Sequence, residues 1–318
     1  MLNLGDFYRG KKVLVTGADG FIGSHLTEKL IGYGALVSVY IHTPDFKNLS
    51  YLSDKIENKI IGDISDKKSI KLVYRNNSSF IFHLAEKKIN VNDSVENILL
   101  TNQTNLTSTL NVLEGARRLK RGNLDRVVFL SSCAVYGSND IPIKESDNFN
   151  PANLYGAGKV KSELSCLSYF ENYGLPLSIV RPFNVYGPKQ NNDTVSSFIK
   201  SALENKDIIL FDGGRHTRDF IYIDDLIDAL LILCYNNKSI GESFNIGTSK
   251  DISIKGLAEK IKKYTNSNSN IILEAQRQVK NVRSCCDLSK TKNTLNWHPK
   301  ISIDGGLKKT IKWIKSTM

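Results

Sequence analysis

The 318-residue chain lacks any apolar run of about 18 residues, the length at which a segment is read as a membrane-spanning helix. Residues 1–12 also lack the apolar core of a secretory signal peptide. The five cysteines are an odd number, and none forms a CxxC pair or a Cys/His cluster with zinc spacing. The sequence therefore predicts no membrane partner, no metal site and a reducing, cytoplasmic location.

Long runs of like charge are also missing, although the net charge is +11. The densest basic groups lie at residues 9–12, 117–121 and 308–309, and none reaches five consecutive charges. Scattered basic residues are typical of a solvated surface, so we expect no nucleic-acid partner. Apolar residues make up 41% of the chain, which is enough for one large or two ordinary globular domains.

The first half of the chain alternates between short apolar strands and helical patterns. Such alternation is typical of βαβ units and a parallel sheet. The predicted fold class is α/β, with a doubly wound parallel sheet of the Rossmann type. The predicted strands cover residues 11–17, 36–42, 58–64, 78–85, 125–132 and 175–184, and the predicted helices cover 24–34, 96–119 and 152–174.

The second half is less regular and mixes helices with short strands. This mixture predicts a smaller α+β domain over residues 181–318, after a first domain over 1–180. Segments at about 218–247 are expected to return to the first domain. The predicted helices are 194–205, 225–235, 254–265 and 304–316, and the predicted strands are 208–211, 243–247 and 271–275.

Three glycines lie between the first predicted strand and the first predicted helix. Gly17, Gly20 and Gly23, in the stretch VTGADGFIGSHL, have the spacing GxxGxxG. Glycines at such a turn let a pyrophosphate approach backbone N–H groups at the helix N-terminus. Because the strand, turn and helix follow in the required order, the stretch predicts a dinucleotide cofactor.

The end of the second strand normally distinguishes NAD from NADP. An acidic residue there hydrogen-bonds the adenosine ribose of NAD, and an arginine accommodates the extra phosphate of NADP. Residues 40–43 are Tyr-Ile-His-Thr and offer neither, although Asp45 or Lys47 could reach from the loop. We expect NAD and leave NADP open. Asp63, after the third strand, is a candidate to hold the adenine amine.

A serine, a tyrosine and a lysine form the candidate catalytic set. Ser132 ends the strand 125–132, and Tyr155 and Lys159 stand four residues apart on one face of the helix 152–174. An unperturbed tyrosine titrates at about pH 10, which is too high for a base at neutral pH. A neighbouring ammonium group would lower this pKa. The set therefore predicts proton transfer at a hydroxyl or carbonyl group.

With these residues, the chain resembles the extended short-chain dehydrogenase/reductase family, and most closely its nucleotide-sugar epimerases and dehydratases. The resemblance covers nearly the whole chain. FHLAE at 82–86 resembles a family segment, with Glu86 where a small residue is usual. Further matching segments follow in family order at residues 105–117, 181–188, 217–225, 244–247 and 287–300.

The resemblance implies roles for individual residues. Tyr155 would be the acid/base, Lys159 would lower its pKa and hold the nicotinamide ribose, and Ser132 would bind the reacting sugar oxygen. The implied residues for the nucleotide sugar are Asn184, Arg218 and Arg277. The implied cofactor residues, besides Tyr155 and Lys159, are Gly17, Gly20, Phe21, Ile22, Gly23, Asp63, Ile64, Leu84, Ala85 and Asn105.

The two residues after Ser132 distinguish among the reactions of this family. The 4,6-dehydratases that resemble the chain carry an acidic pair there, which protonates a departing hydroxyl and removes a C5 proton. Here the pair is Cys133-Ala134, and Ala134 also disfavours the related decarboxylases. The sequence therefore predicts C4 epimerisation of a UDP-hexose or a UDP-N-acetylhexosamine. Ser284 occupies a position where a bulky residue restricts some 4-epimerases of the resembling family to plain hexoses. A small residue there implies room for an N-acetyl group.

Two other functions stay open at this point. An NADPH-dependent 4-keto-sugar reductase would use the same Ser132, Tyr155 and Lys159, and a non-catalytic protein that senses a dinucleotide would need only the glycine turn. The resemblance also implies polysaccharide biosynthesis as the setting. It implies a homodimer in which two long helices per subunit, near 96–117 and 152–172, form a four-helix bundle.

Overall fold

The computed structural model describes residues 3–87, 94–119, 123–137, 140–191, 193–274 and 283–318. The chain divides into two compact units, each made of three segments. The first unit contains Met1–Val135, Pro151–Arg181 and Ile227–Phe244, and the second contains Tyr136–Asn150, Pro182–Leu226 and Asn245–Met318.

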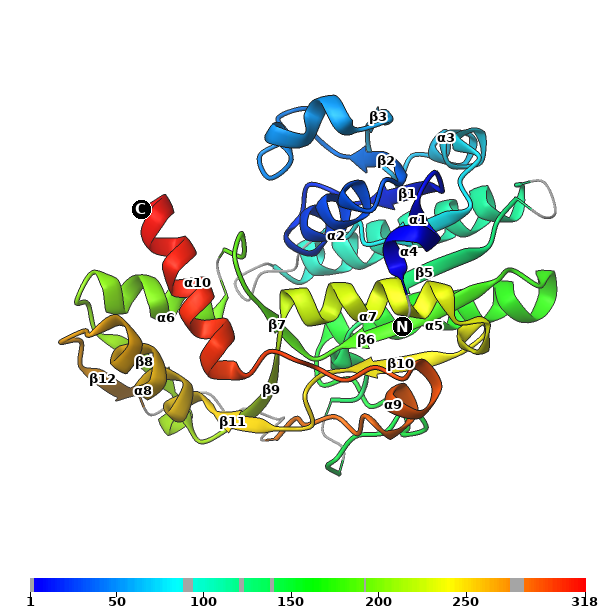
Figure 1. Ribbon diagram of the computed structural model, residues 1–318. Helices are drawn as coiled ribbons and strands as arrows, with labels where there is room; N and C mark the ends of the chain where they lie inside the picture. The colour runs from blue at the N-terminus through cyan, green and yellow to red at the C-terminus, as the bar shows by residue number, and fades with distance from the viewer. Residues whose placement is uncertain (1–2, 88–93, 120–122, 138–139, 192, 275–282) are drawn as a thin grey trace. The chain divides into compact units, whose positions relative to one another are not determined.

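The first unit is built on a seven-stranded sheet (Figure 1). The strand order is β10-β6-β5-β4-β1-β2-β3, and the neighbouring pairs from β3 to β6 are parallel. The order reverses between β1 and β4, where doubly wound sheets leave a crevice for a ligand. The strands are β1 (Lys12–Thr16), β2 (Leu36–Ile41), β3 (Asn58–Ile61), β4 (Phe80–His83), β5 (Arg126–Leu130), β6 (Leu177–Pro182) and β10 (Ser243–Ile246).

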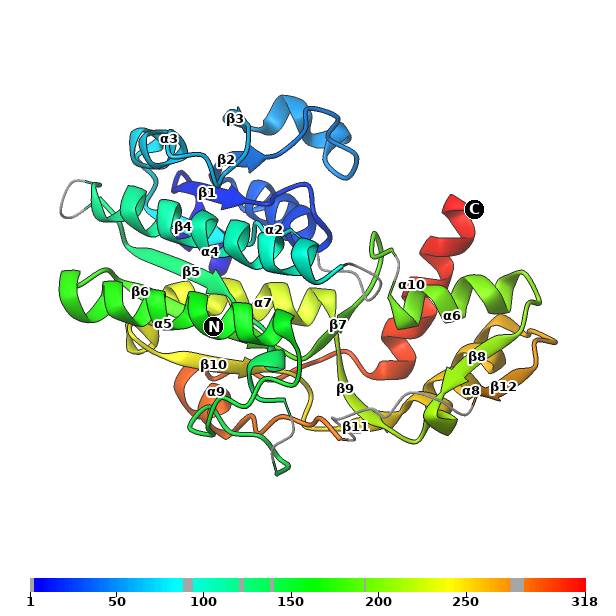
Figure 2. The ribbon, with the colours of Figure 1, turned by 180° about the vertical axis from the view of Figure 1, so that it is seen from behind.

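Helices cover both faces of this sheet. Helices α2 (Phe21–Gly32) and α7 (Ile223–Tyr235) lie on the face seen in Figure 1. Helices α3 (Ser69–Asn76), α4 (Val95–Arg117) and α5 (Leu154–Tyr173) lie on the opposite face, with α4 packed against both α3 and α5 (Figure 2). The short helix α1 (Leu4–Tyr8) is joined to α7 by a 2.9 Å hydrogen bond from Tyr8 Oη to Leu231 O.

The core of the first unit lies between the central strands and these helices. Every residue of β4 and β6 is buried, as expected for strands that are covered on both faces. Leu14, Ile81 and Val127, from three neighbouring strands, pack with Val112 and Leu113 of α4. The apolar runs of the sequence therefore form the buried central strands, and their packing against the helices holds the carboxyl ends of these strands in place.

The second unit contains two small sheets and a group of helices. The larger sheet has the order β11-β9-β7, and the smaller one pairs β12 with β8. Helices α6, α8 and α10 pack against one another. The elements are β7 (Asn184–Tyr186), α6 (Thr194–Leu203), β8 (Ile208–Phe211), β9 (Thr217–Tyr222), β11 (Asp251–Ser253), α8 (Ile254–Thr265), β12 (Ile271–Glu274), α9 (Ser289–Leu295) and α10 (Ile303–Thr317).

The predicted α/β fold with a Rossmann-type sheet is confirmed, although helices α1, α3 and α9 and strands β9 and β11 were not predicted. The predicted strand 175–184 is two strands, β6 and β7, which belong to different sheets. Helix α3 was not predicted, because it is only eight residues long, is polar on average and buries only Ser69 and Val73. The roles predicted for the two domains stay predictions.

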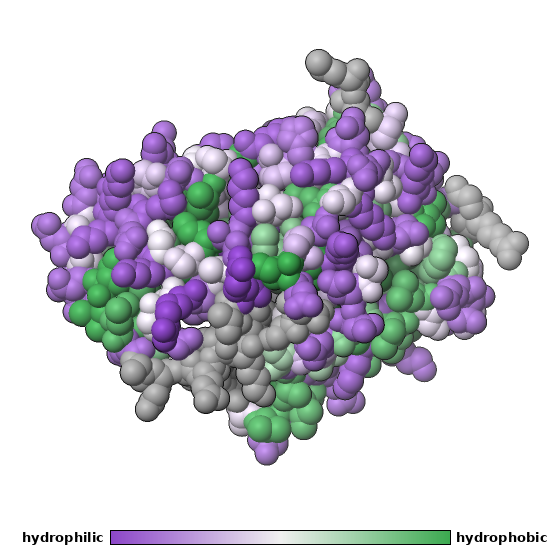
Figure 3. Space-filling view, turned by 90° about the horizontal axis from the view of Figure 1, so that it is seen from below, coloured by the Kyte–Doolittle hydropathy of each residue, from purple (hydrophilic) through white to green (hydrophobic). Residues whose placement is uncertain are grey.

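The surface mixes hydrophilic and apolar residues. Figure 3 shows hydrophilic residues spread over one face of the molecule, with separate apolar patches between them. In the part of the chain that the structure describes, no helix combines the length and the apolarity needed to cross a bilayer. The same part contains no cluster of His, Cys, Asp or Glu side chains suited to a metal ion.

Candidate active site

The turn between β1 and α2 requires glycine at two positions. Gly17 has a φ of +67°, and a Cβ there would lie 2.7 Å from the Cα of Ala85. A Cβ on Gly23 would lie 2.2 Å from the carbonyl oxygen of Gly17. Gly20 is the N-cap of α2 and has no side chain to occupy the first N–H groups of the helix. The turn is therefore shaped to bring a phosphate close to the backbone.

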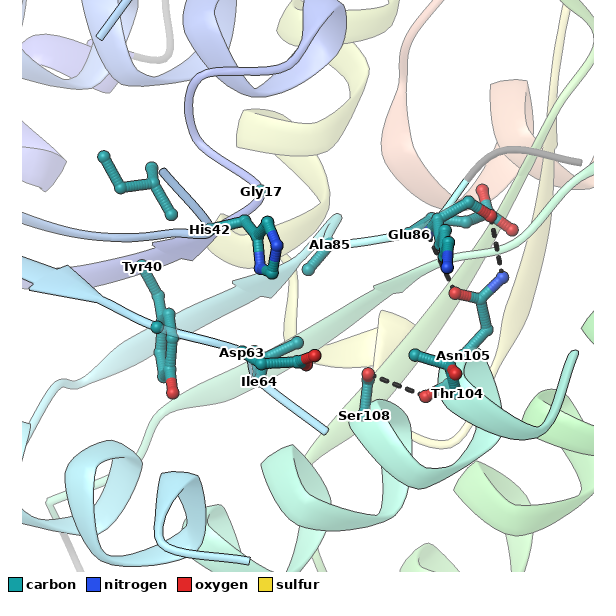
Figure 4. A pocket seen from close by; sticks show the side chains of 13 residues that line it. Gly17, Tyr40, His42, Asp63, Ile64, Ala85, Glu86, Thr104, Asn105 and Ser108 are labelled. Carbon is teal, nitrogen blue, oxygen red and sulfur yellow. Dashed lines mark hydrogen bonds between the residues drawn. The ribbon is translucent and has the colours of Figure 1, made fainter. Parts of the chain in front are cut away.

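A cavity of about 430 Å³ opens beside this turn (Figure 4). It lies where the order of the sheet reverses, at the carboxyl ends of the strands. The cavity suits the adenosine part of a dinucleotide, and the glycine turn suits its pyrophosphate. The wall is formed by Gly17, residues 40–42, residues 62–64, residues 85–87, Thr104, Asn105 and Ser108.

Replacing Gly23 by alanine is expected to weaken NAD binding at least about tenfold, because the new Cβ would collide with the Gly17 carbonyl and shift the turn. Calorimetric titration of the purified variant with NAD measures this change. Gly32→Ala is the matched control, since it lies in the same helix and a Cβ there meets nothing within 4 Å. Equal affinity of Gly23→Ala and the wild type would contradict the assignment of the turn.

Asp63 presents a carboxylate to the cavity (Figure 4). The hydroxyl and the backbone N–H of Ser65 donate to Asp63 Oδ1 at 2.7 and 2.8 Å. The first of these hydrogen bonds is the main cause that lowers the pKa of Asp63, so the group is ionised at neutral pH. From the end of β2, His42 lines the cavity, while Asp45 and Lys47 form an exposed ion pair of 3.7 Å.

The segment after β4 is fixed by hydrogen bonds from two sides. Asn105 Nδ2 donates to Lys87 O at 3.0 Å, and Lys87 N donates to Asn105 Oδ1 at 2.8 Å (Figure 4). The N–H groups of Leu84 and Ala85 donate to the carbonyl and hydroxyl oxygens of Thr16, each at 3.2 Å. Asn105, which was predicted to bind the cofactor, therefore also fixes the backbone at Lys87 and with it this side of the cavity.

The other predicted cofactor residues lie around the same crevice. Phe21 and Ile22 form the first turn of α2, directly after the glycine turn. Ile64 lines the cavity next to Asp63. Of the predicted cofactor residues, the structure thus places Gly17, Asp63, Ile64, Ala85 and Asn105 in the wall of this cavity.

The first turn of α5 packs against the turn that follows β5. Asn153 Oδ1 accepts the N–H of Gly156 at 2.8 Å and caps the helix. A Cβ on Gly156 would lie 2.3 Å from Ala134 O, so glycine permits the close approach of the two backbones. In the facing turn, Ser132 Oγ accepts the N–H of Ala134 at 3.1 Å. These contacts place Ser132 beside the start of α5.

Tyr155 and Lys159 lie on successive turns of α5 and face the end of β5. Lys159 Nζ donates to Leu130 O at 2.9 Å, and the lysine side chain is buried. Ser132 lies close enough to Tyr155 for its hydroxyl to lower the pKa of the tyrosine. The structure therefore brings the three predicted catalytic residues together.

Glu86 joins this set from the segment after β4. Its Oε1 lies 3.0 Å from Lys159 Nζ, and its Oε2 accepts a hydrogen bond from Tyr155 Oη at 3.4 Å. The second distance is long for an O–H···O bond. The sequence showed only that Glu86 replaces the small residue that is usual in the resembling family. It did not predict the contact with Tyr155, because the sequence pattern does not show where the Glu86 side chain points.

The pKa of Tyr155 differs from the expected direction. Burial raises it well above the usual value of about 10, and the charge of Glu86 raises it further. The Ser132 hydroxyl lowers it by a smaller amount. Lys159, which was expected to lower this pKa, is not among its main causes, and its Nζ lies 3.0 Å from Glu86 Oε1. Tyr155 is therefore protonated at neutral pH in this state.

The predicted substrate residues Asn184 and Arg218 lie on neighbouring strands of the second unit. Asn184 begins β7 and its Nδ2 donates to Asp219 O at 3.1 Å. Arg218, on β9, donates from Nη1 to Thr217 O at 2.7 Å and is half-buried. Arg277 lies outside the described residues.

A family model described as the NAD dependent epimerase/dehydratase family matches residues 13–247. The chain belongs to this family. The match contains the glycine turn, the segment with Glu86, and the set formed by Ser132, Tyr155 and Lys159.

Proteins that are similar to this chain are named for different reactions. The UDP-glucuronate 4-epimerase of Thermodesulfobacterium geofontis is 33% identical over 324 residues, covering 96% of this chain and 96% of that protein. The UDP-N-acetyl-alpha-D-glucosaminuronate decarboxylase of Bacillus cytotoxicus is 32% identical over 330 residues, covering 96% and 98%. The crystal structure of UDP-glucuronic acid 4-epimerase from Bacillus cereus, with UDP-glucuronic acid and NAD, is 29% identical with a TM-score of 0.87, covering 96% and 100%.

These similarities confirm the predicted family and NAD as the cofactor. They also confirm the predicted class of enzyme, an NAD-dependent nucleotide-sugar epimerase. Because relatives of nearly equal identity are named for different reactions, the carbon that reacts and the sugar that binds must be argued from the residues of the site.

Proposed function

We propose that the protein is a nucleotide-sugar 4-epimerase whose substrate is a UDP-hexose or a UDP-N-acetylhexosamine. The observation that carries the proposal is the identity of the residues that face the start of α5. Ser132 and Tyr155 lie close together there, and the pair that follows Ser132 is Cys133-Ala134. A 4,6-dehydratase needs an acid and a base at that pair, and alanine supplies neither.

Tyr155 is assigned the proton transfer at the C4 oxygen, and Ser132 holds that oxygen by a hydrogen bond. Lys159, which is anchored to Leu130 O, holds the nicotinamide ribose. When bound, NAD takes a hydride from C4 and returns it to the opposite face. Between these two events the 4-keto sugar has to rotate, so the chain must bind it mainly through the nucleotide diphosphate.

Asn184 and Arg218 are assigned to that diphosphate and to the nucleotide. A guanidinium suits the task, because it offers paired N–H donors to phosphate oxygens. Arg277 is assigned a similar role. The UDP group is supported by the names of the relatives, and the N-acetyl group by the small, buried Ser284, whose carbonyl accepts the N–H of Asp219 at 2.9 Å.

Incubation with a panel of UDP-, GDP-, CDP- and TDP-sugars, followed by NMR of the products, tests this function. We expect a C4 epimer of a UDP-sugar to form without added cofactor. A 4-keto-6-deoxy product would show a dehydratase instead. No turnover with any sugar would favour a protein that only senses the dinucleotide.

A 4-keto-sugar reductase is the second candidate. One observation favours it: Tyr155 is protonated, as a ketone reduction needs. An epimerase retains bound NAD through purification, whereas a reductase consumes added NADPH in stoichiometric amounts. Measuring the nucleotide in the purified protein separates the two.

We also propose that the enzyme is a homodimer in which α4 and α5 of each subunit form a four-helix bundle. These two helices pack side by side in the first unit (Figure 2). Both carry large apolar side chains that are exposed, and exposed apolar residues gathered on one face are typical of an interface. These side chains include Val95, Leu99, Leu100, Leu110, Leu154 and Leu164.

Replacing Leu100 on α4 or Leu164 on α5 by aspartate is expected to convert the dimer into a monomer, because each buries a charge in an apolar interface. Light scattering coupled to gel filtration measures the mass. Leu72→Asp on α3 is the control, since Leu72 is also exposed but lies on another helix. A wild-type protein that runs as a monomer at micromolar concentration would contradict the proposal. The cytoplasmic location and the part in polysaccharide biosynthesis stay predictions.

A further inference from the structure

Glu86 lies between Tyr155 and Lys159, the two residues that the family resemblance predicts to interact directly. Its Oε1 is 3.0 Å from Lys159 Nζ, and its Oε2 accepts the Tyr155 hydroxyl at 3.4 Å. Lys159 continues the hydrogen-bonded chain to Leu130 O, 2.9 Å away. The order is therefore Tyr155, Glu86, Lys159, and a carboxylate accepts the hydrogen bond of the tyrosine.

The backbone that carries Glu86 is held in place on both sides. The N–H of Ala85 is bound to Thr16, and Lys87 is bound twice by Asn105. The Glu86 side chain itself is only 25% exposed. Its carboxylate is thus directed at Tyr155 by a fixed segment, and contacts between catalytic groups of this kind commonly shorten once substrate is bound.

The charged and titratable groups that face Tyr155 come from three elements. Glu86 follows β4, Lys159 lies on α5, and the Cys133 thiol follows β5. His83 of β4 is neutral, because burial and the Lys159 charge lower its pKa to about 3. Burial first, and then the charge of Glu86, raises the pKa of Tyr155 well above 10. Tyr155 is therefore protonated at pH 7, so it needs a proton acceptor of its own.

We propose that Glu86 is the proton-accepting partner of Tyr155. As Tyr155 Oη takes the proton of the sugar hydroxyl, its own proton passes to Glu86 Oε2. The O–H bond of the sugar breaks, a new Tyr155 O–H bond forms, and Glu86 becomes a neutral carboxylic acid. The sugar carbon is oxidised by losing its hydride to NAD, and both protons move back in the return half-reaction.

This role explains why a carboxylate is useful where the resembling family has a small residue. With Glu86 paired to Lys159, a carboxylate lies beside Tyr155 as a proton acceptor although Tyr155 is not ionised. Glu86 acts through Tyr155 and does not touch the sugar, so it is a positioning residue. The inference rests on the proposed function, because it requires oxidation of a sugar hydroxyl.

Glu86→Gln keeps the size of the side chain and removes its ability to accept the proton. At pH 7 we expect kcat of this variant to fall about 10- to 100-fold, with the KM for the nucleotide sugar changed less than about threefold. Between pH 7 and pH 9 the variant should gain roughly tenfold per pH unit as tyrosinate forms, while the wild type stays nearly level. Glu171→Gln, an exposed position on α5, is the control and should match the wild type.

A second measurement is independent of turnover. Ultraviolet titration of tyrosinate, taken as the difference from the same protein with Tyr155→Phe, follows the ionisation of Tyr155 alone. We expect a lower pKa of Tyr155 in Glu86→Gln than in the wild type, because one negative charge has been removed. The NAD content of the purified variant should equal that of the wild type. Glu86→Asp, which keeps a shorter carboxylate, should be slow but should show no steep pH dependence.

A Glu86→Gln variant that is as fast as the wild type at pH 7, or faster, overturns the proposal. An unchanged titration of Tyr155 overturns it as well, since it would mean that Glu86 is not coupled to the tyrosine. These outcomes differ from a failure of the proposed function, in which the wild type itself turns over no nucleotide sugar.

Discussion

Replacing Tyr155 by phenylalanine is expected to lower kcat about 10³-fold, while the binding of NAD and of the nucleotide sugar stays within a few-fold of the wild type. The variant loses the oxygen that exchanges a proton with the substrate, and acid–base catalysis contributes about 10² to 10⁴ in rate. It keeps the aromatic ring, so the packing of the first turn of α5 is preserved. Steady-state kinetics by NMR, together with calorimetric titration of NAD, measures both quantities.

Tyr173→Phe is the matched control for this variant. Tyr173 is the last residue of the same helix and is largely exposed, so loss of its hydroxyl should leave kcat unchanged. If Tyr155→Phe retained more than about a tenth of the wild-type kcat, the assignment of Tyr155 as the acid/base would be wrong.

Replacing Glu163 by alanine is expected to lower the free energy of unfolding by about 3–5 kcal/mol, because it leaves a buried arginine without its carboxylate. Arg181 Nη2 lies 2.6 Å from Glu163 Oε2, and Arg181 Nε lies 3.0 Å from Oε1. Both side chains are almost completely buried, and the Ser131 hydroxyl donates to the same carboxylate. Denaturant unfolding of the apoprotein measures the change.

This buried group also links the elements that carry the catalytic residues. Glu163 lies on α5 below Tyr155 and Lys159, Arg181 lies on β6, and Ser131 precedes Ser132 at the end of β5. Glu171→Ala, at an exposed position of α5, removes the same charge and should cost less than about 0.5 kcal/mol. Equal unfolding curves for the two variants would contradict a structural role for the buried ion pair.

The elements that carry the fold were predictable because their periodicity is local. The strand expected at 36–42 is β2 (Leu36–Ile41), and the helix expected at 152–174 is α5 (Leu154–Tyr173). Helix α3 was missed, since six of its eight residues are not buried and its pattern resembles a polar loop. The sequence also does not reveal that the predicted strand after α5 divides between two sheets.

The candidate site was predictable where motif and position coincide. Ser132, Tyr155 and Lys159 follow from a strand end and a helical spacing, and the structure brings them together. The place of Glu86 beside Tyr155 did not follow, because it depends on packing between segments 69 residues apart. The prediction that the pKa of Tyr155 is lowered was wrong for the same reason. Burial raises this pKa, and so does the carboxylate of Glu86, which is distant in the sequence but adjacent in the fold.

The measurement that tests the central claim most directly uses a UDP-sugar with deuterium at C4, incubated with the purified protein in ordinary water without added cofactor. A 4-epimerase removes the label as a hydride and returns it to the same carbon. We predict a C4 epimer that retains its deuterium at C4, as seen by NMR and mass spectrometry. An epimer that has lost the deuterium, or a 4-keto-6-deoxy sugar as the product, would contradict the account.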